Sequence, residues 1–131
     1  MEKRIDEITE RIIGCCFKVH RSLGSGFLEK IYENALMIEL EWAGLRARQQ
    51  SPVPVNYEGH RIGEYFADVI VEDTVVCELK AGNALGKEHE IQLVHYLMAT
   101  GIDVGLLVNF GKSVTVKRKF RRHQVPGNRN E

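Results

Sequence analysis

The sequence predicts a small α/β domain in which helices cover a mixed β-sheet. Apolar residues recur at helical spacing in two N-terminal stretches and in a third stretch beyond the middle of the chain, whereas runs typical of strands fill most of the remainder. The 131 residues, of which 44% are hydrophobic, suffice for one core. We therefore expect a single domain over residues 1–122 and a flexible tail over 123–131.

Helical spacing predicts three helices. The first covers residues 3–22, the second runs from Phe27 to about Ala43, and the third covers 88–100. Glycines beside these segments indicate where each helix stops. The side chains expected in the core from the second helix are Leu28, Ile31, Ala35, Leu36, Leu40 and Trp42, and the apolar positions of the third are Ile91, Val94, Leu97 and Met98.

Five extended segments complete the predicted fold. Residues 52–81 divide into three of them, with turn signals at 58–59 and 72–73. Residues 103–110 are almost continuously apolar, as in a strand buried on both faces, and 113–120 form the last strand. The predicted order is ααβββαββ. The helix between the third and fourth strands then makes a crossover, which we expect to be right-handed.

Composition and charge argue against several classes of protein. The 18 Lys and Arg residues balance 18 Asp and Glu, so the chain does not coat nucleic acid through bulk charge alone. Cys15, Cys16 and Cys77 lack the spacing of a zinc site and suit a reducing compartment. The charged N-terminus is unlike a signal peptide, and no apolar run approaches a membrane span. We expect a cytoplasmic protein that does not enter a membrane.

Asp68, Glu78 and Lys80 carry the strongest candidate chemistry. Glu78 and Lys80 are two residues apart on one strand, so their side chains point to the same face. A three-residue connection would pair Val71 with Val75. Asp68 would then lie opposite Glu78, with Cβ atoms about 5 Å apart. Two carboxylates this close repel each other unless a cation lies between them, and a hard divalent ion such as Mg²⁺ prefers oxygen ligands.

A simpler explanation exists for each of these residues. A D…ExK pattern is short, and alone it is better explained by a cross-strand charge pair on a solvated face. Two further patterns change the balance, because Glu29 and Tyr32 share a face of the second helix and Gln92 and Tyr96 share a face of the third. A core tyrosine or a first-turn carboxylate accounts for each pattern separately. One shared site accounts for all of them together.

The segment GFLEKIY, with Gly26, Glu29 and Tyr32, resembles the signature of the GxxExxY family, a group of small proteins assigned to the PD-(D/E)xK nuclease superfamily. The likeness continues through YEGHRIGEYFAD, CELKA, HEIQLVHYLMATG and GLLVNF, so that only the ends of the chain fall outside it. Gln92 and Tyr96 are similar to the QxxxY motif of RecB-like nucleases in the same superfamily.

The resemblance implies a restriction-endonuclease-like fold and roles for the matching residues. Asp68 and Glu78 would hold Mg²⁺ or Mn²⁺, with Glu29 as a third carboxylate. Lys80 would orient or deprotonate the attacking water. The residues expected to position the site or the substrate are Gln92, Tyr96, Tyr32 and His20. Of these, His20 is a candidate only because it precedes the loop that leads to the second helix, and a structural histidine is the better explanation for it.

The resulting hypothesis is a Mg²⁺-dependent nuclease that hydrolyses phosphodiester bonds in DNA or RNA. The alternatives are a non-catalytic nucleic-acid-binding or protein-interaction module that retains the nuclease fold, and a purely structural partner in a complex. The basic run 116–122 suits phosphate contacts and the protection of an edge strand about equally. So small a chain has little surface for gripping a polymer, and a homodimer would supply more.

Overall fold

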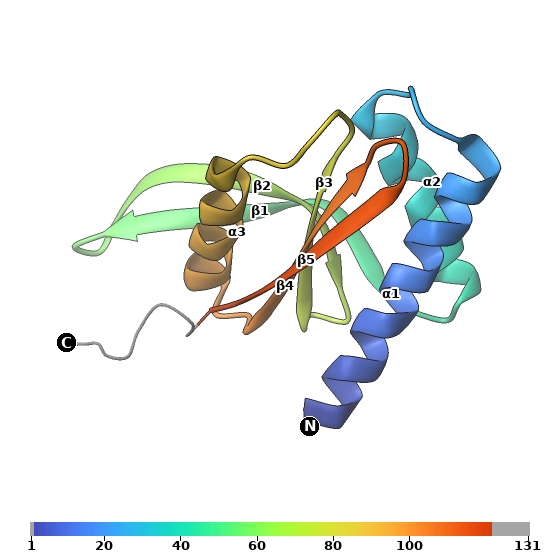
Figure 1. The fold of residues 1–131 in the computed structure, drawn as a ribbon. Helices are drawn as coiled ribbons and strands as arrows, with labels where there is room; N and C mark the ends of the chain where they lie inside the picture. The colour runs from blue at the N-terminus through green and yellow to red at the C-terminus, as the bar shows by residue number, and fades with distance from the viewer. Residues whose placement is uncertain (1, 122–131) are drawn as a thin grey trace.

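Three helices flank a five-stranded sheet in the computed structural model, which describes residues 2–121 (Figure 1). The order of elements confirms the predicted ααβββαββ arrangement. The tail predicted over 123–131 lies outside the described residues. The elements are α1 (Glu2–Leu23), α2 (Glu29–Trp42), β1 (Ala47–Tyr57), β2 (His60–Val71), β3 (Val75–Lys80), α3 (Lys87–Thr100), β4 (Val104–Phe110) and β5 (Val114–Phe120).

The sheet is mixed, as predicted. Its strand order is β1-β2-β3-β4-β5, with a parallel pairing between β3 and β4 and antiparallel pairings elsewhere. Helix α3 connects the two parallel strands, which is the crossover that the sequence pattern predicts. Every residue of β4 is buried, because helices cover this strand on both faces.

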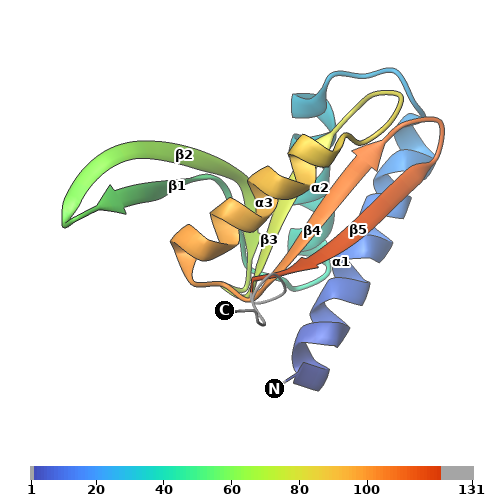
Figure 2. The ribbon, with the colours of Figure 1, turned by 60° about the vertical axis from the view of Figure 1, so that its left-hand side comes forward.

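The two faces of the sheet carry separate cores. Helices α1 and α2 lie on one face and α3 lies on the other (Figures 1 and 2). On β3, Cys77 and Leu79 belong to the core under α1 and α2, whereas Val76 belongs to the core under α3. Since side chains alternate along a strand, Glu78 and Lys80 point to the α3 face.

Several side chains expected in the core are instead exposed. Leu28 is 79% exposed and Trp42 is 73% exposed, because one lies in the extended segment before α2 and the other is the last residue of that helix. The buried stripe of α2 follows Tyr32, Leu36 and Leu40, four residues apart. Three other residues expected in the core are also exposed, namely Ile31, Ile91 and Met98. On α3, Leu93 and Tyr96 are buried in place of Ile91 and Met98.

The β1–β2 hairpin is longer than predicted and extends away from the body of the molecule (Figure 2). β1 begins at Ala47, and it tolerates Pro52 and Pro54 because it is an edge strand. Several apolar side chains on the hairpin are exposed, namely Tyr57, Ile62, Tyr65 and Phe66. None of the helices described here is long and apolar enough to cross a membrane.

Candidate active site

The turn between β2 and β3 sets the register of the site. Val71 pairs with Val75 across a three-residue connection, which confirms the predicted register. Glu72 and Asp73 adopt left-handed backbone conformations, with φ of 54° and 53°, as tight hairpin turns with the right twist require. The Glu72 carboxylate accepts a hydrogen bond from the Arg46 N–H at 2.7 Å, which holds the turn against the start of β1.

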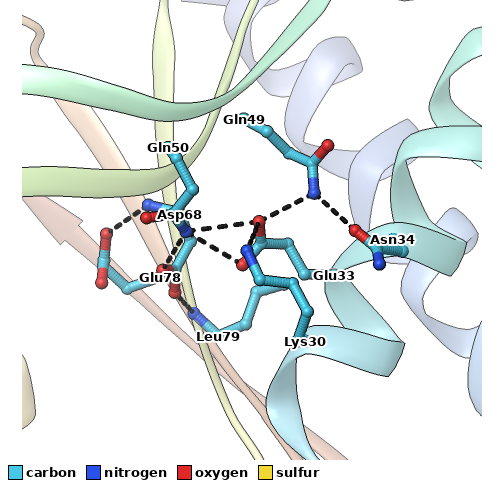
Figure 3. Close-up of polar contacts among 8 residues, drawn as sticks. All are labelled: Lys30, Glu33, Asn34, Gln49, Gln50, Asp68, Glu78 and Leu79. Atoms are coloured by element: carbon cyan, nitrogen blue, oxygen red, sulfur yellow. Dashed lines mark hydrogen bonds and ion pairs between the residues drawn. The ribbon is translucent and has the colours of Figure 1, made fainter.

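Asp68 and Glu78 lie together just beyond the last backbone pair of β2 and β3. The Asp68 N–H donates to Glu78 Oε2 at 3.0 Å, and the Leu79 N–H donates to Asp68 Oδ2 at 2.8 Å (Figure 3). Each carboxylate therefore accepts from the backbone of the opposite strand, in place of a carbonyl. This arrangement fixes the two side chains relative to each other.

The two carboxyl groups are held in an environment that disfavours their charge. Glu78 is only 5% exposed, and burial followed by the nearby charge of Asp68 raises the pKa of Glu78 to about 8. Burial also raises the pKa of Asp68, against the opposing effect of the Leu79 N–H. Raised carboxyl pKa values of this kind cluster at functional sites, whereas pairing with a cation would have lowered the pKa of each carboxyl group.

Lys80 is the nearest positive charge on the same strand. It is partly buried, and its charge lowers the pKa of both Asp68 and Glu78, although more weakly than burial raises them. No hydrogen bond or ion pair between residues 2 and 121 joins the Lys80 ammonium to either carboxylate. Lys80 therefore lies near the two carboxyl groups without forming an ion pair with either of them.

Glu33 is a third carboxylate that sequence reasoning missed. It lies on α2 and is only 4% exposed. Its carboxylate accepts from Lys30 Nζ at 3.1 Å and from Gln50 Nε2 at 3.1 Å, and Gln50 Nε2 also lies 3.3 Å from Asp68 Oδ1 (Figure 3). Gln50 thus bridges the helix carboxylate to the strand carboxylate. The charge of Glu33 contributes to the raised pKa of Asp68.

A sequence signal for Glu33 did exist. It precedes Leu36 by three residues and Leu40 by seven, so it lies beside the buried stripe of α2. A carboxylate at such a position is rarely buried unless it is paired or used. No comparable signal marks Gln50, because the position of its side chain depends on its own left-handed backbone conformation, with φ of 48°, within β1.

Tyr96 and Gln92 are the residues of α3 that lie on the side of the carboxylates. Gln92 Nε2 donates to the Tyr96 hydroxyl at 3.1 Å, and Tyr96 is buried. Burial and the charges of Glu78 and Asp68 raise the pKa of Tyr96 to about 12, so its ring lies within electrostatic reach of the pair. The ring of Tyr65 on the long hairpin contacts that of Tyr96, with centroids 5.2 Å apart.

The remaining candidates from the sequence occupy other places. Tyr32 is buried against Phe110, with ring centroids 4.5 Å apart, and its hydroxyl donates to the Gly24 carbonyl at 2.6 Å. His20 Nε2 lies 2.8 Å from the Gly111 carbonyl oxygen, at the turn between β4 and β5. Glu29 is exposed at the start of α2. Within residues 2–121, no hydrogen bond or ion pair joins any of these three to Asp68, Glu78 or Lys80.

Most of the basic run predicted over 116–122 lies on β5 and forms ion pairs with helices α1 and α3, whereas Arg122 lies outside the described residues. Lys117 and Lys119 both contact Glu90 of α3, at 2.7 and 3.0 Å, and they lower the pKa of Glu90 to about 2. Arg118 pairs with Asp6 on the other face of the sheet. Of the two explanations that the sequence left open, these pairs favour protection of an edge strand over phosphate contacts.

Comparison with known proteins places the chain in a family. Residues 6–123 match a family model described as the PD-(D/E)XK nuclease superfamily. No curated protein matches the chain. Similar solved structures include SSO0001, at 20% identity and a TM-score of 0.54, and an alkaline exonuclease from Laribacter hongkongensis, at 14% identity and a TM-score of 0.53.

These structural likenesses concern the fold alone. The match to SSO0001 covers 70% of this chain and 48% of that protein, and the match to the exonuclease covers 70% and 55%. The chain therefore spans about half the length of these solved structures. The family model, by contrast, extends from the first turns of α1 past the end of β5. The chain belongs to the PD-(D/E)XK nuclease superfamily.

Proposed function

We propose that this protein is a divalent-metal-dependent nuclease that hydrolyses phosphodiester bonds in nucleic acid. The observation that carries the proposal is the buried pair of Asp68 and Glu78, whose charges are disfavoured, with Lys80 beside it on the same face. A protein that only binds nucleic acid has no physical need for clustered carboxylates at the end of a buried strand. The superfamily and its use of divalent metals agree with this assignment.

The donor set suits a hard cation such as Mg²⁺ or Mn²⁺. Carboxylate oxygens are the ligands that these ions prefer, and a cation beside Asp68 and Glu78 would favour the charged forms that burial and neighbouring carboxylates disfavour. Across residues 2–121, no three acidic, His or Cys side chains are gathered tightly enough to complete a metal site unaided. Glu33, connected to Asp68 through Gln50, is the best-placed third carboxylate, and Glu29 is the one that the family motif names.

The residues around the pair divide the chemistry between them. A bound metal ion would lower the pKa of a coordinated water and neutralise charge on the phosphate. Lys80 would orient the attacking water and stabilise the negative charge that develops on the non-bridging oxygens. Tyr96, with Gln92 behind it, would position the substrate next to the carboxylates. Tyr32 would act indirectly, by fixing the loop before α2 through its bond to Gly24.

A groove beside the site is suited to a polymer. It has a volume of about 470 Å³, and its walls come from the long hairpin and from α3. Tyr65 lines it and also contacts Tyr96, which connects the groove to the candidate site. An exposed aromatic ring at such a place supports contact with bases.

Narrower membership of the GxxExxY family is supported by the spacing of Gly26, Glu29 and Tyr32.

Divalent metal is expected to stabilise the folded protein. Binding to the native state alone adds about 2.7 kcal/mol to the free energy of unfolding when the ion is present at about 100 times its Kd. Mg²⁺ or Mn²⁺ should therefore raise the Tm measured by calorimetry, and Asp68→Asn should abolish the rise. A rise of the same size in Asp68→Asn would place the ion at another site.

Substitutions on α2 would identify the third carboxylate. Glu33→Gln should weaken the metal-dependent rise in Tm, because the amide lacks the negative charge that attracts the ion. Glu29→Gln is the matched control, one helical turn earlier and exposed, and it should leave the rise unchanged. Titration calorimetry with Mn²⁺ compares the two affinities. The opposite pattern would show that the motif residue, and not Glu33, completes the site.

Cleavage of labelled nucleic acids tests the proposed activity directly. The panel should contain single- and double-stranded DNA and RNA, linear and circular, each incubated with Mg²⁺, with Mn²⁺ and with a chelator. We expect cleavage of at least one substrate that depends on the added metal. Circular substrates separate an endonuclease from an exonuclease, since only the former can open them.

A further inference from the structure

One buried polar atom next to the candidate site has no partner. Asn109, on β4, is 3% exposed, and its Nδ2 donates to the Gly82 carbonyl at 3.1 Å. That bond fixes which way the amide points. Its Oδ1 accepts no hydrogen bond from any described residue between 2 and 121. Buried acceptors are almost always satisfied, so an orphan of this kind requires an explanation.

The orphan lies beside the proposed catalytic lysine. Asn109 is the register partner of Lys80 on the parallel neighbour strand. Leu107, two residues earlier on β4, packs in the core under α3, so Asn109 points to the same face of the sheet as Lys80. Thr115 continues this row on β5, as the register partner of Asn109. The row therefore leads away from the carboxylate pair along the end of the sheet.

A pocket of about 320 Å³ opens at this row, within the range of roughly 300–1,000 Å³ typical of small-ligand sites. Polar groups of its lining include the Asn109 amide, the hydroxyls of Ser113 and Thr115, and the ammonium of Lys112. No carboxylate belongs to the described lining. Lys117 also borders the pocket but is held by Glu90 at 2.7 Å, so Lys112 supplies most of the positive charge.

The walls of the pocket are held in place. A Cβ added to Gly111 would lie 2.8 Å from the Gly82 carbonyl oxygen, so the two loops approach as closely as glycine allows. His20, from the other face of the sheet, contacts the Gly111 carbonyl oxygen at 2.8 Å. Asn109 itself belongs to the lining, and Lys112 and Asn83 are exposed at the rim, where side chains change rotamer within nanoseconds.

We propose that this pocket binds the sugar–phosphate unit of a nucleotide adjacent to the one that is cleaved, with the Asn109 Oδ1 accepting a hydrogen bond from a sugar hydroxyl. The proposal rests on the nuclease function proposed above. A phosphate only accepts, so it cannot satisfy Oδ1, whereas a hydroxyl donates. Lys112 would contact the phosphate next to that sugar. The hydroxyl is either a 2′-OH of RNA or the terminal 3′-OH of a strand.

Binding of four labelled oligonucleotides of one sequence tests the proposal. The first pair is RNA and 2′-O-methyl RNA, and the second is DNA with a 3′-OH and DNA with a 3′-deoxy end. Binding is measured by fluorescence anisotropy at low salt, with a chelator present so that nothing is cleaved. In each pair, one member carries a hydroxyl donor that its partner lacks. In at least one pair, we expect that member to bind about five- to tenfold more tightly, as one hydrogen bond to a buried acceptor allows. The pair that shows the preference identifies the hydroxyl.

Substitutions separate this contact from a structural role of Asn109. Asn109→Ala should remove the preference for the hydroxyl, whereas a residue that only holds the Gly82 loop would weaken both members of a pair equally. Asn109→Leu, which keeps the branching of the side chain, serves if Asn109→Ala does not fold. Lys112→Gln should weaken all four oligonucleotides and reduce the salt dependence, and Lys18→Gln on α1 should change neither.

Two results would overturn the proposal: equal or no binding within both pairs, or a preference that persists in the Asn109 variants. The outcome is separable from that of the nuclease proposal. A hydroxyl preference in a protein that cleaves nothing would refute the nuclease function and leave the pocket assignment intact. Cleavage without a hydroxyl preference would refute the pocket alone.

Discussion

Lys80→Ala is expected to fold normally, to bind metal and to lose cleavage by about 100- to 10,000-fold. In the proposed mechanism the carboxylates would hold the ion, whereas the lysine would act on the water and on the charge that develops at phosphorus. Its interactions would therefore be made mainly in the transition state and would affect kcat more than substrate binding. Normal folding is expected because, among residues 2–121, the Lys80 ammonium makes no hydrogen bond to Asp68 or Glu78.

Parallel purification of wild type, Lys80→Ala and Lys18→Ala provides the measurement and its control. Lys18 lies on α1 and pairs with Glu39, away from the α3 face, so its removal should leave the cleavage rate unchanged. If Lys80 were only a charge on a solvated face, its loss would cost at most about 1 kcal/mol of stability and would hardly alter activity. Unaltered cleavage by Lys80→Ala would mean a contaminant or a different site. Absence of cleavage in wild type, with metal binding intact, would favour the non-catalytic module.

The register of the site was predictable because two independent constraints agreed. The side-chain period of a strand puts Glu78 and Lys80 on one face, and the turn signal at 72–73 allows few connections. A three-residue connection was the one that brought Asp68 to Glu78, and the pairing of Val71 with Val75 follows it. Local rules suffice here because β2 and β3 are consecutive in the chain.

The third carboxylate could not be derived in the same way. Glu29 and Glu33 are four residues apart and share one face of α2, so which of them approaches Asp68 depends on where the helix lies along its own axis relative to β2. That position follows from the packing of Tyr32, Leu36 and Leu40, which the spacing of apolar residues does not specify. The sequence pattern also suggested an inward face that included Leu28 and Ile31, which are exposed.

The motif residues Gly26 and Tyr32 have a local structural explanation. Gly26 has a φ of 106°, a conformation that other residues rarely adopt. The Tyr32 hydroxyl accepts from the Phe27 N–H at 3.3 Å and donates to the Gly24 carbonyl, so it closes the loop between α1 and α2. The spacing of glycine and tyrosine in this motif therefore builds the start of α2. That function and a place at the site cannot be distinguished from the spacing alone.

The metal-free protein is expected to lose stability as the pH rises from about 4.5 to about 8. The pKa of Glu78 is about 8 in the folded state, against an ordinary value of 4.5. Between these two values the folded protein keeps a proton that the unfolded chain has released, so the free energy of unfolding falls with pH. The raised pKa of Asp68 acts in the same direction. The total fall should be a few kcal/mol, since one pKa unit corresponds to about 1.4 kcal/mol.

Chemical denaturation at a series of pH values, in chelator and then in Mg²⁺, measures this effect. Glu78→Gln should remove most of the fall, because the amide does not titrate, and Glu10→Gln, at an exposed position on α1, should leave it unchanged. Saturating metal should flatten the fall or reverse it, because a cation favours the ionised carboxylates that high pH produces. Metal and proton then compete for the same pair. A fall that persists undiminished in both Glu78→Gln and saturating Mg²⁺ would show that the titrating group is not the one proposed to hold the ion.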